Sequence, residues 1–170
     1  MFHKRFPFFH QHDANDCGPA CLQMISAYYG KRFSLEYIRE QTSMRIGISM
    51  LGVYEAASKL GFRVLGAWTT YGRLKELPLP CIVYWNQNHF VVVYKIDPRR
   101  DIVYLANPVL GLVKLSKEEF CRCWVNTGYQ ESKGAVLFLE PTSAFYKHEI
   151  PAEKRGKFFS LLRYLRPFKK

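Results

Sequence analysis

The chain changes from helix-type to strand-type sequence near residue 61, and this order limits the folds that it can adopt. Apolar residues at helical spacing, bounded by capping serines and by glycines, predict helices over residues 16–29, 34–41 and 49–60. Later runs rich in Val, Ile and Tyr predict strands over 62–68, 81–85, 89–96, 102–106, 112–115 and 135–140, with short helices over 71–77 and 116–124. This order indicates an α+β fold in which N-terminal helices pack on an antiparallel sheet.

The size and composition of the chain fit one globular domain with its own hydrophobic core. The 170 residues are 48% hydrophobic and 23% charged, which is not the composition of a disordered chain. No apolar run reaches the length of a membrane span, and the basic, aromatic N-terminus lacks the apolar centre of a signal peptide. The five cysteines are an odd number, which favours free thiols in a reducing compartment. We therefore expect a cytoplasmic location.

Positive charge is concentrated at the C-terminal end. The formal net charge is +11, and residues 147–170 supply +6 of it through eight Lys or Arg and two Glu. Four apolar residues recur there at helical spacing: Phe158, Leu161, Leu162 and Leu165. A basic helix with an apolar stripe is typical of an anionic membrane surface, and the alternative is a terminal helix packed on its own domain. No zinc-finger spacing or RNP-like segment is present, so no nucleic acid is expected as a partner.

Cys17 lies where the first predicted helix opens, inside the segment 11–21, QHDANDCGPAC. The unpaired N–H groups and the dipole of a helix N-terminus favour the thiolate, which is the nucleophilic form of cysteine. Gln11 carries a side-chain NH₂ that can donate to an oxyanion formed beside Cys17. Asp16 is expected to cap the helix. The alternative is that Cys17 is a small apolar residue and Gln11 a surface loop residue.

His89 and Asn107 lie at the ends of two neighbouring predicted strands. If residues 97–101 form a five-residue hairpin loop, Ile96 faces Ile102. His89 and Asn107 then lie diagonally on one face of the sheet, within reach of a hydrogen bond. A four-residue loop would put Asn107 on the other face. The alternative is that His89 is a strand-edge residue and Asn107 an ordinary turn residue before proline.

Together, Cys17, His89 and Asn107 supply a nucleophile, a general base and an orienting group. They occur in the chain order of the cysteine-protease constellation. This combination favours acyl transfer through a thioester, with Gln11 as the donor to the oxyanion.

The other cysteines are weaker candidates for chemistry. Cys21 lies one helical turn after Cys17 and is either a redox partner or, as we expect, a buried residue on the helix face. Cys121 and Cys123 are too closely spaced for a zinc ribbon and have no second pair, so no metal site is expected.

Segments 11–21 and 80–93 together resemble the papain-like peptidase domain at the N-terminus of bacteriocin-exporting ABC transporters, the double-glycine leader peptidases. The similarity covers about residues 8–140. It implies a papain-like fold, with Cys17 as nucleophile, His89 as general base and Gln11 as oxyanion-hole donor. The family usually has Asp-Pro after the histidine hairpin. This chain has Asn107 before its proline, and papain-like enzymes commonly use Asn in the orienting position.

The resemblance also implies how the chain is organised. Residues 1–145 would form the peptidase domain, and residues 146–170 a basic linker and amphipathic helix leading into a transmembrane domain. The chain has no phosphate-binding loop motif, so no cofactor is expected in it and ATP would bind in a separate nucleotide-binding domain. The domain would lie on the cytoplasmic face of the bacterial inner membrane. The strand that ends at 140 and the proline after it are expected to close the compact part.

The function implied is that of a cysteine endopeptidase that cleaves leader peptides after a Gly-Gly-type pair, before an ABC transporter exports the cargo. Its partners would be the leader peptide, the transmembrane and nucleotide-binding domains, and an anionic membrane surface. One alternative is a catalytically impaired domain that binds leaders and presents cargo. A second is a basic membrane-surface or nucleic-acid-binding module, which would be favoured only if the neighbourhood of Cys17 proved buried and inert.

Overall fold

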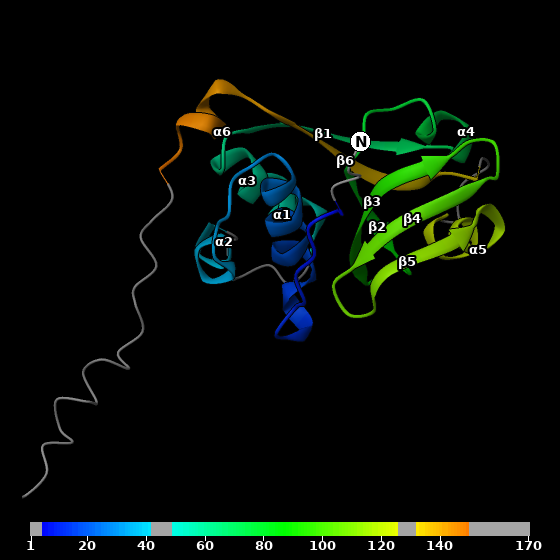
Figure 1. The fold of residues 1–170 in the computed structure, drawn as a ribbon, viewed down its shortest axis with the longest axis horizontal. Coiled ribbons are helices and arrows are strands. Elements are labelled where there is room, and N and C mark those ends of the chain that lie inside the picture. Colours follow the sequence, from blue (N-terminus) through cyan, green and yellow to red (C-terminus); the bar gives the residue numbers. More distant parts are fainter. Residues whose placement is uncertain (1–4, 42–48, 126–131, 150–170) are drawn as a thin grey trace, which may run out of the picture.

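The computed structural model describes residues 5–41, 49–125 and 132–149 (Figure 1). Its helices are η1 (a 3-10 turn, Ala14–Asp16), α1 (Cys17–Tyr28), α2 (Leu35–Gln41), α3 (Met50–Lys59), α4 (Tyr71–Leu74), α5 (Lys117–Trp124) and α6 (Ser143–Lys147). Its strands are β1 (Phe62–Thr69), β2 (Cys81–Trp85), β3 (His89–Asp97), β4 (Ile102–Asn107), β5 (Gly111–Ser116) and β6 (Gly134–Pro141). The strands form one sheet in the order β1-β6-β2-β3-β4-β5, and every neighbouring pair is antiparallel. The predicted α+β class is confirmed.

Most predicted element boundaries agree with the structure to within one residue, and α4 is the exception. The helix predicted over 71–77 ends at Leu74. The next turn is tighter, because the N–H groups of Glu76 and Leu77 donate to carbonyls three residues back. Pro78 restricts the backbone of Leu77, since a proline disfavours helical backbone in the residue before it, and so limits how far this turn can continue.

The sheet carries a hydrophobic core on each face. In β3, Phe90 and Val92 face the helices α1–α3, whereas Val91 and Val93 face α4 and α5. Figure 1 shows α1–α3 on one side of the sheet and α4 and α5 on the other. Burial on both faces explains why β3 is an almost continuous apolar run rather than an alternating one.

The start of α1 packs unusually close to its neighbours. A Cβ atom added to Gly18 would lie 2.7 Å from Cγ2 of Val53 in α3 and 3.7 Å from the ring of Phe90 in β3. Glycine at this position therefore lets the first turn of α1, which contains Cys17, lie directly against α3 and the beginning of β3.

The hairpin between β3 and β4 is tighter than expected. Asp97 pairs with Ile102, so the loop has four residues and the expectation of five is wrong. In a regular ladder this change would move Asn107 to the opposite face. A β-bulge at Tyr94 adds one residue to β3, however, and returns the strands to the expected register from Val93 toward the site.

The compact part of the chain continues beyond β6, where the sequence suggested that it ends. Phe145 in α6 is fully buried in the core beside the helices. Gly61 has φ +93°, and a Cβ there would lie 2.4 Å from the backbone nitrogen of Phe145, so α6 needs a glycine at this contact. His148 lies 2.7 Å from the Tyr37 hydroxyl through its Nε2. The amphipathic helix expected beyond residue 149 lies outside the described residues.

Candidate active site

Cys17 is the first residue of α1, and its side chain has no exposed surface. The thiol lies where the opening of α1 meets the beginning of β3. The backbone N–H groups of Phe90, Gly18 and Cys17 itself are directed so as to stabilise a thiolate. These donors match the expectation that the helix opening provides a site for negative charge.

The net effect on the Cys17 thiol is nevertheless the reverse of the expected one. Burial is the largest influence and raises the pKa of Cys17 above its ordinary value of 9.0. The three N–H groups lower this pKa, and the neighbouring Asp16 carboxylate raises it. The N–H groups at the helix opening lower this pKa, as expected, but the effect of burial is larger. Burial and the Asp16 charge therefore favour the thiol over the thiolate at Cys17.

His89 is placed at the head of β3 by a tight turn after β2. Asn86 and Gln87 both have positive φ, at 47° and 57°, and the N–H of Asn88 donates to the Trp85 carbonyl over 3.2 Å. Asparagine tolerates such left-handed backbone better than most residues. This turn reverses the chain and pairs His89 with Trp85 across the ladder.

His89 and Asn107 are in direct contact. His89 Nε2 lies 3.2 Å from Asn107 Oδ1, so the structure brings together the two side chains that the register argument paired. An amide oxygen only accepts hydrogen bonds, so Nε2 carries the proton of the neutral ring. Nδ1 is then the unprotonated nitrogen that can accept a proton.

The Asn107 carboxamide is itself held in place. Its side chain is only 6% exposed, and Oδ1 also accepts the N–H groups of Val109 at 2.9 Å and Leu110 at 3.4 Å. Because three donors converge on Oδ1, the orientation of the amide group is fixed. Asn107 is therefore both a turn residue and a hydrogen-bond partner of the histidine.

Burial also governs the ionisation of His89. It lowers the pKa of the ring below the ordinary value of 6.5, and the hydrogen bond with Asn107 raises it again in part. The imidazole is therefore neutral at pH 7. Burial thus favours the uncharged form of each side chain, a thiol at Cys17 and a neutral imidazole at His89.

Gln11 is anchored at two points. Its backbone N–H donates to the Pro108 carbonyl over 3.1 Å, which ties it to the turn after Asn107. Its Nε2 donates one N–H to the Asp13 carbonyl over 3.0 Å. Within the described ranges, the second N–H of Nε2 meets no acceptor, and the buried Oε1 has no hydrogen-bond partner. The second N–H of Gln11 Nε2 can therefore donate a hydrogen bond to an oxygen atom of a bound peptide.

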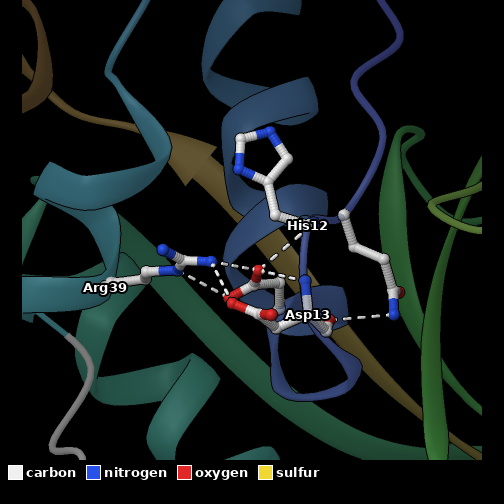
Figure 2. A network of polar contacts seen from close by, with 5 residues as sticks. His12, Asp13 and Arg39 are labelled. Carbon is white, nitrogen blue, oxygen red and sulfur yellow. Dashed lines mark hydrogen bonds and ion pairs between the residues drawn. The ribbon is translucent and has the colours of Figure 1, made fainter.

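Asp16 stands at the N-cap position of α1, as expected, but the hydrogen bond expected from a capping side chain is missing. Its side chain makes no cap bond to that helix and instead accepts the N–H groups of His12 at 3.2 Å and Asp13 at 2.8 Å. It also forms an ion pair with Arg39 of α2 (Figure 2). Sequence reasoning missed Arg39, because no local spacing links a residue in the second helix to the turn before the first.

An apolar hollow of about 400 Å³ lies between α3, β1 and β6. Its walls include Met50, Leu51, Tyr54, Ala67, Trp68 and Leu137. Three of these side chains are large and exposed: Leu51 by 56%, Tyr54 by 40% and Trp68 by 49%. Exposed aromatic and aliphatic side chains gathered around one hollow are typical of a surface that binds an apolar partner.

All five cysteines are free thiols. Cys21 is fully buried, and burial raises its pKa well above 9.0, in agreement with a core residue on the helix face. Among the described residues, no cluster of His, Cys, Asp and Glu could hold a metal ion, and no helix is long and apolar enough to cross a membrane.

The sequence is similar to known proteins over most of its length. Residues 5–138 match the Peptidase C39 family. The colicin V secretion/processing ATP-binding protein CvaB of Escherichia coli is 29% identical over 148 residues, which are 86% of this chain and 20% of that protein. The lactococcin-G-processing and transport ATP-binding protein LagD of Lactococcus lactis subsp. lactis is 31% identical over 161 residues, 90% of this chain and 21% of that protein. The chain thus spans about a fifth of the length of these curated relatives.

Two solved structures share the fold. A double glycine motif protease from an AMS/PCAT transporter, in complex with the leader peptide, has a TM-score of 0.69 and 34% identity and covers 84% of this chain and 97% of its own. The peptidase domain of Streptococcus ComA has a TM-score of 0.67 and 28% identity and covers 81% of this chain and 100% of its own. Because the family match extends over most of the 170 residues, this chain belongs to the Peptidase C39 family.

Proposed function

We propose that this chain is a cysteine endopeptidase that cleaves leader peptides after a Gly-Gly-type pair, before an ABC transporter exports the cargo. The observation that carries the proposal is the contact between His89 Nε2 and Asn107 Oδ1, which leaves Nδ1 as the proton acceptor. The relatives support the substrate class, since their names describe secretion and processing and one structure holds a leader peptide.

The first half of the reaction forms a thioester. The Cys17 sulfur attacks the carbonyl carbon of the second small residue while its proton moves to Nδ1 of His89. The carbonyl electrons move onto oxygen. When they return, the C–N bond breaks and the imidazolium of His89 donates its proton to the leaving amine. In this order a thiol with a raised pKa is still useful, because it loses its proton as it attacks.

The second half releases the leader. Water attacks the thioester carbon and passes a proton to Nδ1, and the sulfur leaves and is then protonated again from His89. In both halves the oxyanion accepts hydrogen bonds from the backbone N–H of Cys17 and from the second N–H of Gln11 Nε2. The anchoring of Gln11 to the Pro108 and Asp13 carbonyls supports this role.

Complete burial of the Cys17 side chain supports the preference for small residues. Because the thiol has no exposed surface, surrounding atoms must move aside before a peptide bond can reach it, and a thin chain requires the smallest movement. Glycines lack a Cβ and fit this requirement, whereas larger side chains before the bond would meet the surrounding atoms.

The apolar hollow between α3, β1 and β6 is the part of the surface that fits the leader itself. We assign it to the apolar face of a helical leader segment, by the helix-in-groove mode of recognition. Leu51, Tyr54 and Trp68 would supply the apolar contacts. Binding energy from this contact, remote from the scissile bond, would hold the substrate in register.

The remaining expectations extend this proposal to the whole transporter. The chain would act on the cytoplasmic face of the bacterial inner membrane, beside transmembrane and nucleotide-binding domains that lie outside it. ATP would bind in the latter domain. The C-terminal tail, residues 146–170, would lie on the anionic membrane surface, because eight basic residues between 147 and 170 favour contact with anionic lipids.

The test is a cleavage assay with a synthetic peptide that has an amphipathic helical segment, a Gly-Gly pair and a short cargo sequence. We expect a single cut after the second glycine, identified by mass spectrometry. Replacing both glycines by valine should abolish the cut. A chain that binds the peptide but leaves it intact would support the leader-presenting domain instead.

A further inference from the structure

Arg39 is joined by a fork of hydrogen bonds to the turn that precedes α1. Its Nε donates to Asp16 Oδ1 over 2.7 Å, and its Nη2 donates to Asp16 Oδ2 and, over 3.0 Å, to Asp13 Oδ2. Figure 2 shows the Arg39 side chain reaching across to this turn. Two N–H groups of one guanidinium fix both the distance and the orientation of a carboxylate.

The Asp16 carboxylate passes this constraint on to the backbone. Oδ2 accepts the N–H of His12 at 3.2 Å and that of Asp13 at 2.8 Å. Asp16 is only 4% exposed, and its hydrogen bonds with Arg39 are the main cause of its lowered pKa. A carboxylate this deeply buried needs such a partner to remain charged.

The same turn determines how the Gln11 carboxamide is oriented. Asp13 is fixed through its N–H and its side chain, and its carbonyl accepts Gln11 Nε2 over 3.0 Å. Within the described part of the chain, Gln11 Oε1 has no partner that could orient the group from its other side. The Asp13 carbonyl is therefore the contact that directs Nε2.

We propose that Arg39 is a positioning residue for peptide cleavage. Through Asp16 it holds the Asp13 carbonyl, and this carbonyl orients the Gln11 carboxamide toward the oxyanion formed at Cys17. The proposal rests on the proposed role of Gln11 as an oxyanion donor. It extends that role to a residue of α2 that would contact neither the substrate nor the reacting atoms.

The first expected effect is on kcat. Arg39→Ala should lower kcat by up to about 10²-fold, the loss typical of a displaced catalytic group, and leave KM unchanged, since Arg39 does not line the apolar hollow. Arg39→Lys keeps a positive charge near Asp16 but loses the fork, and its kcat should fall less. The control is Arg73→Ala, because Arg73 forms an exposed ion pair with Glu76 over 2.8 Å in another part of the surface.

A double-mutant cycle separates positioning from general stability. We would measure kcat for the wild-type chain, Arg39→Ala, Gln11→Ala and the double variant, with thermal unfolding of each. If Arg39 acts through Gln11, Arg39→Ala should cause no further loss of kcat once Gln11 is replaced. The proposal would be overturned if Arg39→Ala lowered kcat by the same factor in the wild-type chain and in Gln11→Ala. It would also be overturned if Arg39→Ala kept the wild-type kcat.

The cycle also separates this inference from the proposed function. If Gln11→Ala alone keeps the wild-type kcat, the oxyanion role is wrong and the role of Arg39 falls with it. If Gln11→Ala lowers kcat, and the loss in the double variant is the product of the losses in the two single variants, only the role of Arg39 is wrong. Should Arg39→Ala fail to fold, Arg39→Lys takes its place in the cycle and is judged by the same two outcomes.

Discussion

His89 Nε2 lies 3.2 Å from Asn107 Oδ1, although the two residues are 18 positions apart in the chain. This contact determines which nitrogen of the ring carries the proton, because the amide oxygen can only accept. Nδ1 is left free to take a proton. The single distance therefore links the register of the β3–β4 hairpin to the direction of proton transfer in the proposed reaction.

The charge at position 107 should set the acid limb of the pH profile. Catalysis needs the neutral imidazole, and burial lowers the pKa of His89, so kcat/KM should fall only as the pH drops below 6.5. Asn107→Asp adds a negative charge that favours the imidazolium, and it should move this limb to higher pH. Asn107→Ala removes a bond that raises the pKa, and it should move the limb to lower pH and reduce the plateau.

The measurement is kcat/KM against pH for the three proteins, with His89→Ala as the inactive reference. If Asn107→Ala matches the wild type at every pH, Asn107 is only a turn residue. If Asn107→Asp moves the acid and basic limbs apart, the resting pair is an ion pair and the neutral pair described above is wrong.

The thiol should react slowly in the absence of substrate. Burial raises the pKa of Cys17 above 9.0, so alkylation by the neutral reagent iodoacetamide should speed up only as the pH approaches and passes this value. Peptide mapping identifies the modified cysteine, and Cys17→Ala serves as the blank. Fast alkylation at pH 5 that disappears in His89→Ala would instead demonstrate a thiolate–imidazolium pair.

Asp16 should stabilise the fold only above acidic pH. Its pKa in the folded chain is lowered from 3.8, mainly by Arg39. The stabilisation is therefore complete above the unfolded value and is lost as the pH falls through the lower folded value. Unfolding temperatures of the wild type and Asp16→Asn should differ most at pH 6 and converge as the pH falls below 3.8. A difference that stays constant down to pH 2 would contradict the ion pair with Arg39.

The apolar hollow should affect KM rather than kcat if it binds the leader. Trp68→Ala removes a large exposed wall and should raise KM, while a short peptide that contains only the Gly-Gly region should be cleaved as before. Leu65→Ala is the matched control, because Leu65 is a 63% exposed residue of the same strand that does not line the hollow. Equal KM values for both variants and the wild type would place leader binding elsewhere.

The elements were predictable because their local signals agree with their packing. Ser49 and Ser116 accept N–H groups at the starts of α3 and α5, as their positions in the sequence indicate. The β3–β4 register shows the limit of such reasoning. The loop was predicted one residue too long, and the bulge at Tyr94 compensates, so His89 and Asn107 meet despite an error in the hairpin.

The site itself was less predictable than the elements around it. The pKa of Cys17 depends on how deeply the thiol is buried, and only the packing of α1 against β3 determines that. Arg39 and the hollow escaped prediction for a related reason, since each depends on elements that are distant in sequence and adjacent in space. Roles for Cys17, His89, Gln11 and Asn107 in catalysis remain predictions.

The most direct test of the account is the cleavage rate of Cys17→Ala beside that of Cys81→Ala. Both cysteines are buried, but Cys81 lies in the core on the other face of the sheet. With a leader peptide that contains a Gly-Gly pair, we expect no product from Cys17→Ala and a wild-type rate from Cys81→Ala. A wild-type rate from folded Cys17→Ala would contradict the assignment of Cys17 as the nucleophile and, with it, the proposed mechanism.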